Sequence, residues 1–242
     1  MLSTRWLGVA SARAALGGWL ASPCAVCRSW DGSRLCRACV ARFVSQAPRC
    51  ERCAIGVPAG VAVCGTCLRD APSYDRSIAA VDYDHPWDAL IAAFKFHGAL
   101  DLASALAQRL VAAVEAAGGV RPDLLLPVPL GPARLAERGY NQAWELARRA
   151  ARALDCRSDA RLLLRIRDTP QQLALPRARR AANVRGAFLV EPRRSGELRG
   201  LHVALVDDVL TTGATAAEIA GLLKQSDATR VQVWVVARTP KD

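Results

Sequence analysis

Apolar and polar positions change their spacing repeatedly along the chain, most clearly after about residue 75. Short, uninterrupted apolar runs are typical of strands that are buried on both faces of a parallel sheet. We expect such strands at residues 77–82, 124–129, 201–206 and 231–237, whereas residues 161–167 form either a further strand or an extended connection.

Between these runs, apolar residues recur at the spacing of one helix face. Helices are expected over residues 87–96, 100–117, 141–154 and 216–225. Strands that alternate with helices indicate a βαβ domain. The fold class is therefore α/β, with a mainly parallel sheet that is flanked by helices.

The first 22 residues are apolar enough to suggest a signal peptide, but Arg13 interrupts the run. Trp6, Leu16 and Trp19 fit one stripe of a helix, so residues 1–22 are interpreted as an amphipathic leader helix. No apolar run reaches the roughly 18 residues that a membrane span needs. We expect a cytoplasmic protein without a membrane span.

The formal net charge of +11 permits acidic partners such as phosphates or DNA. It does not establish them, because only Lys95, Lys224 and Lys241 are lysines. The other basic residues are arginines, a bias that a GC-rich genome produces without selection for DNA binding.

Eight of the nine cysteines form four C-x-x-C pairs in a segment otherwise poor in large apolar residues. Each pair offers two thiolates to one ion, so the eight thiolates suffice for two closed, structural Zn²⁺ sites. A disulfide framework, an iron–sulfur cluster and a redox C-x-x-C motif are the alternatives. We favour sequential pairing, with one site at Cys24, Cys27, Cys36 and Cys39 and the other at Cys50, Cys53, Cys64 and Cys67.

The stretch VALVDDVLTTGAT, residues 203–215, places two carboxylates and a hydroxyl-rich loop between an expected strand and an expected helix. Small residues let the backbone approach a phosphate, and the first N–H groups of the helix point at the same place. We predict a phosphate cradle that consists of Thr211, Thr212, Gly213, Ala214 and Thr215.

Acids so close to a phosphate would repel it, so Asp207 and Asp208 are expected to bind sugar hydroxyls, directly or through Mg²⁺. The implied ligand is a sugar 5-phosphate. The alternative is that the acids only end a strand and that the loop only caps a helix.

This stretch resembles the signature of type I phosphoribosyltransferases, which bind phosphoribosyl pyrophosphate (PRPP). More of the chain resembles one branch, the ComF or GntX group of competence-associated proteins, over roughly residues 22–239. The matching segments are Tyr74-Asp75, Lys95-Phe96-His97-Gly98, PVPL at 127–130, RGYNQ at 138–142, and the residues Arg134, Arg167, Thr169, Pro170, Gln172, Arg180, Asn183, Gly186, Ala187 and Phe188.

The resemblance implies a type I phosphoribosyltransferase fold with an N-terminal zinc-binding module. It divides the chain into the leader helix, a double zinc-ribbon-like module at 23–70 and a phosphoribosyltransferase-like domain at 73–242, with a mobile hood at 165–188. It implies that Asp207 and Asp208 grip the ribose and that residues 211–215 hold the 5-phosphate. The pyrophosphate loop and its charges would be Pro127, Val128, Pro129, Leu130, Arg134, Arg138 and Lys95.

Two functions of different class follow from this resemblance. The first is a phosphoribosyltransferase that uses PRPP with Mg²⁺, linked to DNA uptake in transformation or to nucleotide metabolism, with an unidentified acceptor. The second is a non-catalytic sensor of PRPP or nucleotides whose zinc module docks competence or DNA-processing proteins or single-stranded DNA. Proteins of this fold family commonly form homodimers.

Overall fold

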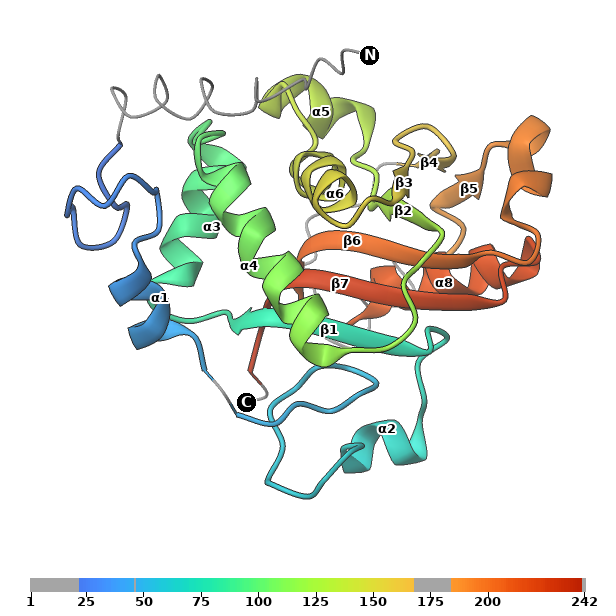
Figure 1. Cartoon of the computed structure of the whole chain (residues 1–242). Helices are drawn as coiled ribbons and strands as arrows, with labels where there is room; N and C mark the ends of the chain where they lie inside the picture. The colour runs from blue at the N-terminus through green and yellow to red at the C-terminus, as the bar shows by residue number, and fades with distance from the viewer. Residues whose placement is uncertain (1–21, 46, 168–183, 241–242) are drawn as a thin grey trace, which may run out of the picture. The chain divides into compact units, whose positions relative to one another are not determined.

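The computed structural model describes residues 22–45, 47–167 and 184–240 (Figure 1). Most of the expected leader helix and most of the expected hood, with its Thr169, Pro170, Gln172, Arg180 and Asn183, lie outside these residues. The chain divides into two compact units, Met1–Phe43 and Val44–Asp242. The division falls inside the segment 23–70, so the second cysteine cluster is grouped with the sheet.

The described residues of the smaller unit, 22–43, contain the first four cysteines and one short helix, α1 (Arg37–Phe43). Its apolar centre is formed by the buried Cys24, Cys36 and Cys39, with Val26 and Phe43 packed against them. An apolar centre of this size is too small to support a fold alone, so a bound metal is expected to supply folding free energy.

The larger unit contains a parallel sheet of five strands in the order β1-β7-β6-β2-β3. The strands are β1 (Arg76–Asp82), β2 (Leu124–Pro127), β3 (Arg157–Ser158), β6 (His202–Leu210) and β7 (Arg230–Arg238). The central strands β6 and β7 are nearly continuous runs of buried apolar residues, as expected where helices cover both faces.

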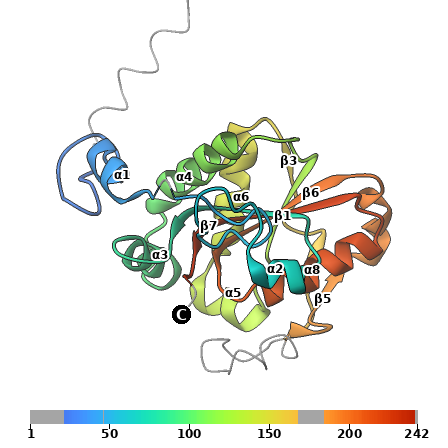
Figure 2. The same cartoon turned by 90° about the horizontal axis from the view of Figure 1, so that it is seen from below.

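Helices α4 and α6 pack against one another and against the sheet, α4 on β1 and β7 and α6 on β2 and β6. Helix α8 packs on β6 and β7 together with the separate strand β5 (Figures 1 and 2). The helices are α2 (Gly65–Arg69), α3 (Trp87–Phe96), α4 (Leu102–Ala117), α5 (Pro132–Arg138), α6 (Gln142–Ala153) and α8 (Ala214–Gln225), with a 3-10 helix at Pro192–Leu198.

The expected α/β class and the mainly parallel sheet are confirmed. Residues 161–167 contribute β4 (Leu163–Arg165), which pairs antiparallel with β5 (Phe188–Val190) outside the main sheet. The expected strand end at 206 is wrong, because backbone pairing with β7 continues to Leu210. The acidic doublet therefore lies within β6 rather than in a loop. Helix α5 was not expected from the sequence.

Among the described residues, no helix is both long and apolar enough to cross a bilayer.

Candidate functional site

Because all five strands are parallel, their carboxyl ends meet at one edge of the sheet, where open α/β sheets bind ligands. A cavity of about 260 Å³ lies at this edge. Its lining comes from the ends of β1, β2, β6 and β7, from α5 and from the start of α8.

Most of the residues that the sequence predicts for the PRPP site line this single cavity. They are Lys95, Val128, Pro129, Leu130, Arg134, Arg138, Asp207, Asp208, Thr211, Gly213, Ala214 and Thr215. Two predicted residues are not among the lining residues: Pro127, the last residue of β2, and Thr212, whose hydroxyl accepts the N–H of Ala214 at 3.4 Å.

The loop between β6 and α8 turns at Gly213, which has a φ of +81°. A Cβ atom there would lie 2.9 Å from the hydroxyl oxygen of Tyr74. Glycine is therefore required both for the left-handed backbone conformation and for the close approach of Tyr74. The N-terminus of α8, a helix of 12 residues, follows this turn, so the positive end of the helix dipole lies beside the loop.

Tyr74 and Asp75 do not line the cavity, but they support the loop between β6 and α8. Tyr74 is buried in the core, and burial raises its pKa above the ordinary value. Asp75 accepts the backbone N–H of Val231 at 2.8 Å and pairs with Lys224 of α8 at 2.8 Å. It thereby connects the start of β7 to the helix that follows the loop.

The two acids of the doublet have different surroundings. Asp208 is buried, and its Oδ1 lies 2.8 Å from Nζ of Lys95 at the end of α3. Burial opposes a charged Lys95, but the carboxylates of Asp208 and Asp207 outweigh it and raise the lysine pKa. Asp207 accepts the N–H of Asp208 at 2.8 Å, and burial followed by repulsion from Asp208 raises the pKa of Asp207 to about 7.

Helix α5 brings Arg134 and Arg138 to the cavity. The guanidinium carbon of Arg138 lies 4.8 Å from the centre of the Phe96 ring. Two residues later, the hydroxyl of Tyr140 donates to the carbonyl oxygen of Phe94. The RGY segment is thus fixed against the KF segment of α3, which explains why two distant motifs meet at one site.

Asn141 holds the loop after β2 to the next helix. Its Oδ1 accepts the N–H groups of Ala143 at 2.9 Å and Trp144 at 3.3 Å, so it caps α6. Its Nδ2 donates to the carbonyl of Val128 at 3.0 Å. The proposed pyrophosphate loop is therefore anchored at its second residue, Val128.

Two buried oxygen atoms of cavity-lining residues have no hydrogen-bond partner within the described part of the chain: Asp208 Oδ2 and Gln142 Oε1. A buried oxygen that is left unpaired costs about 1–3 kcal/mol. Ligand hydroxyls or a cation that reached these atoms would satisfy them, so both residues favour a polar ligand.

Four cationic side chains, Lys95, Arg134, Arg138 and Arg165, line the cavity together with the two acids. This excess of positive charge favours an anionic ligand. Three lining residues outside the matched motifs are Tyr83, Val233 and Thr239, and two of these, Tyr83 and Thr239, directly follow the strands β1 and β7.

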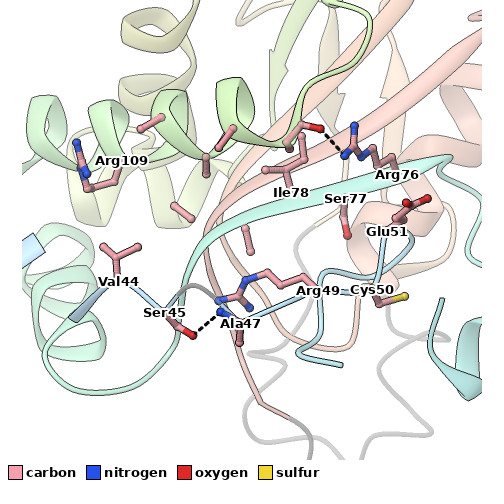
Figure 3. Close-up of a pocket in the computed structure, with 16 residues that line it drawn as sticks. Val44, Ser45, Ala47, Arg49, Cys50, Glu51, Arg76, Ser77, Ile78 and Arg109 are labelled. Atoms are coloured by element: carbon pink, nitrogen blue, oxygen red, sulfur yellow. Dashed lines mark hydrogen bonds between the residues drawn. The ribbon is translucent and has the colours of Figure 1, made fainter. Parts of the chain in front are cut away.

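A second cavity, of about 490 Å³, lies between β1, α4 and residues 44–51 (Figure 3). Alanines of α4 form one wall, and Arg49, Arg76 and Arg109 lie around it. Arg76 is held by the carbonyls of Ala117 and Gly118 at 2.8 Å each. No residue predicted for the PRPP site lines this cavity.

The cysteines group sequentially, as we favoured, into one set at 24, 27, 36 and 39 and another at 50, 53, 64 and 67. Within each set the sulfur atoms all lie within 4.8 Å of one another, which fits one tetrahedral ion. None of these cysteines forms a disulfide in the described chain. Burial opposes ionisation of Cys24, but the N–H groups of Cys36, Cys27 and Val26 lower its pKa to about 6. Each set thus fits a structural Zn²⁺ site.

No family model matches the chain. It is similar to the DNA utilization protein YhgH of Salmonella typhi, with 36% identity over 91% of this chain and 96% of that protein. It is also similar to competence protein F of Haemophilus influenzae, with 34% identity over 84% of this chain and 90% of that protein. Competence protein ComFC of Bacillus subtilis is 26% identical over 78% of each chain. A PRPP amidotransferase structure from B. subtilis aligns with a TM-score of 0.36 at 21% identity, over 54% of this chain and 25% of that one, too low to carry an inference.

Proposed function

Because the chain belongs to the ComF family, which includes the DNA utilization and competence proteins named above, we propose that it binds PRPP with Mg²⁺ at the carboxyl-edge cavity. The proposed biological role is in the uptake or use of DNA. The single observation that carries the binding proposal is the cavity itself, which joins the acidic doublet, the loop at 211–215 and the arginines of α5.

In this proposal the 5-phosphate binds the N–H groups and hydroxyls of residues 211–215 at the start of α8. The ribose hydroxyls bind the doublet, and the buried, unpaired Asp208 Oδ2 supports a donor or cation there. The pyrophosphate group binds near Arg134 and Arg138, since the arginine fork matches phosphate oxygens.

Carboxylate oxygens are preferred ligands of Mg²⁺, so Asp207 and Asp208 would meet the ion that arrives with PRPP. The ion would partly neutralise the diphosphate. Lys95 has a different proposed role from the one expected: because it pairs with Asp208, it is positioned to exchange that carboxylate for a phosphate oxygen when ligand binds.

One experiment distinguishes the two candidate functions, a transferase and a sensor. As a transferase, the protein would break the bond between C1 of the ribose and pyrophosphate and form a bond between C1 and an acceptor. As a sensor, it would bind PRPP and release none of its pyrophosphate. The exposed Trp30, 74% accessible, supports a docking role for the smaller unit in either case.

The binding test is calorimetry with PRPP and Mg²⁺ on the wild type and on Asp207→Asn/Asp208→Asn. We expect micromolar affinity in the wild type and a loss of at least about tenfold in the double variant, since ribose and cation contacts disappear. Asp155→Asn, a carboxylate outside the cavity, is the matched control. Unchanged affinity in the double variant would remove the ribose assignment. Pyrophosphate release against a panel of bases and amines then decides between transferase and sensor.

The pH dependence follows from Asp207. With its pKa near 7, the acid is mostly protonated at pH 6 and ionised at pH 8, so PRPP should bind more tightly at the higher pH. The stability of the fold changes with pH in the opposite direction: it decreases as the pH rises. Because Asp207 has a higher pKa in the folded state than in the unfolded state, proton binding to this carboxylate stabilises the fold. This stabilisation is complete below the unfolded-state pKa and is lost as the pH rises through about 7. Asp207→Asn should remove this dependence from thermal unfolding between pH 5 and pH 8, and a retained slope would contradict the assignment.

A further inference from the structure

A buried arginine at the end of β7 lies between the second cysteine cluster and the loop that precedes α8. Arg238 is 5% exposed. Its Nε donates to the carbonyl oxygen of Cys53 at 2.8 Å. Its Nη1 lies 2.9 Å from the carbonyl oxygen of Leu210 and 2.7 Å from that of Thr211. One side chain thus bonds to a cysteine of the cluster and to the residues that lead into the loop.

The remaining partners of Arg238 belong to the next residue. Nη1 also lies 2.7 Å from the carbonyl oxygen of Thr239 and 3.0 Å from its hydroxyl. Among the described residues no carboxylate forms a salt bridge with Arg238, so oxygen dipoles of the backbone compensate its charge. A buried guanidinium is costly unless such partners stay in place, and the oxygens around it are therefore held together.

Tyr74 approaches the same loop at Gly213. Its ring is 2% exposed, and its hydroxyl oxygen is the nearest atom to the position of a Cβ on Gly213, at 2.9 Å. The same tyrosine lies in the core with Ala54, the residue that follows Cys53. The loop is thus contacted by both Tyr74 and Arg238, and both residues also lie against the segment of the second cluster.

We propose that Arg238 is a positioning residue through which the second cysteine cluster fixes the main chain of residues 210–213 for phosphate binding. The inference rests on the proposed function in one respect, namely that the ligand of the loop is a phosphate. Arginine is required because its planar group directs Nε and Nη1 toward two sets of oxygens at once. Lysine has one nitrogen and reaches only one set.

The main test compares Arg238→Lys with Arg230→Lys, which replaces an arginine at the opposite end of the same strand. The probes are PRPP, ribose 5-phosphate and inorganic pyrophosphate, each with Mg²⁺. For Arg238→Lys we expect the Kd of both 5-phosphate ligands to rise by at least about tenfold, while that of pyrophosphate changes by less than about twofold. Arg230→Lys should change none of them.

This pattern separates positioning from general support of the fold. Loss of overall stability would weaken all three probes alike, and an equal loss for all three overturns the proposal. Zinc content should stay at about two ions per chain in Arg238→Lys, because the cysteines are untouched.

Hydrogen exchange provides a readout that needs no ligand. Amides of residues 210–215 should exchange faster in Arg238→Lys than in Arg230→Lys, whereas amides of β2 should be unchanged. Unchanged exchange in the loop overturns the proposal. If the wild type binds neither PRPP nor ribose 5-phosphate, the proposed function fails, and exchange still decides whether Arg238 fixes the loop.

Should Arg238→Lys not fold, Thr239→Val is the milder variant. It removes one of the four oxygens around Nη1 and keeps the guanidinium. We expect faster exchange of the loop amides and a twofold to threefold weaker binding of ribose 5-phosphate, about 0.4–0.7 kcal/mol. No change in either measurement overturns the proposal.

Discussion

The two cysteine clusters are built on the same local design. In each, the backbone N–H of the third cysteine donates to the sulfur of the first, at 3.4 Å in one cluster and 3.3 Å in the other. In each, the residue after the second cysteine has a positive φ, +65° at Arg28 and +56° at Ala54. In each, the backbone N–H of the first cysteine donates to the carbonyl oxygen of the residue five positions later, at 2.8 Å. The metal-binding unit is therefore a repeated piece of local structure.

The clusters differ in what surrounds this turn. Arg28 is exposed at the position where the second cluster has Ala54, which is fully buried. Ala54 belongs to the main core together with Tyr74 and Ala79 of β1. A side chain larger than alanine has no space at this point, whereas the first cluster accepts an arginine there.

The second cluster also covers the free edge of the sheet. Strand β1 is an edge strand, and its Ser77 donates its N–H to the carbonyl of Glu51 at 3.0 Å and its hydroxyl to that of Arg52 at 2.7 Å. Unpaired edge groups are a liability that proteins cover. One cysteine motif thus belongs to a separate unit in one place and covers the edge of a sheet in another.

The largest effect is expected from emptying each cluster in turn. Cys50→Ser/Cys53→Ser should weaken PRPP binding by more than about tenfold and lower the Tm of the larger unit by roughly 10 °C or more, because structural zinc supplies much folding free energy. Cys24→Ser/Cys27→Ser is the matched control, since those ligands belong to the separate unit.

Calorimetry, metal analysis and thermal unfolding measure these outcomes. Each double variant should lose about one zinc per chain. Equal losses of PRPP affinity in the two variants would show that the clusters are equivalent, and the comparison drawn above would then be wrong.

The next largest effect is expected when the residue types at the positive-φ position of the two clusters are exchanged. Ala54→Arg places a charged side chain in the core and should destabilise the larger unit by about 3–5 kcal/mol. Arg28→Ala changes an exposed residue and should stay within about 0.5 kcal/mol. Chemical denaturation followed by fluorescence of the buried Trp234 reports the larger unit. Similar destabilisation in both variants would contradict the different packing of the two turns.

The smallest effect tests the hydrogen bond at the sheet edge. Ser77→Ala removes a buried hydroxyl that donates at 2.7 Å and should cost about 1 kcal/mol, a shift of about 2–4 °C in Tm. Ser33→Ala removes the corresponding kind of bond in the smaller unit, where the hydroxyl donates to the carbonyl of Leu35 at 3.0 Å. Only the first variant should lower the unfolding temperature of the larger unit.

Much of the fold was predictable because its signals are local. The helix at 87–96 was expected with the bounds it has, and Asn141, where the expected helix at 141–154 begins, caps α6. The end of β6 was misplaced, because charged side chains mask a backbone pairing that only the neighbouring strand reveals. Helix α5 was missed because seven residues with no buried side chain leave no periodic apolar signal.

The candidate site divides in the same way. Residues 207–215 and the arginines of α5 were predicted from motifs, because a short stretch of sequence indicates the chemistry of each. Arg238 and Gln142 were not, since an arginine at the end of an apolar strand carries no distinguishing pattern, and the RGYNQ segment does not reveal that its Gln142 is buried beside the cavity. Their importance depends on oxygens and carbonyls that are distant along the chain.

By itself the sequence determined the α/β class, the four C-x-x-C pairs and the doublet with its phosphate-sized loop, because each is encoded by spacing within a few tens of residues. Only the tertiary structure decided that Lys95 pairs with Asp208, and that the two similar cysteine motifs have different surroundings. The physical reason is that burial, ion pairing and shared hydrogen bonds are properties of residues brought together in space. A pattern along the chain specifies a local element, but not which neighbour that element will meet.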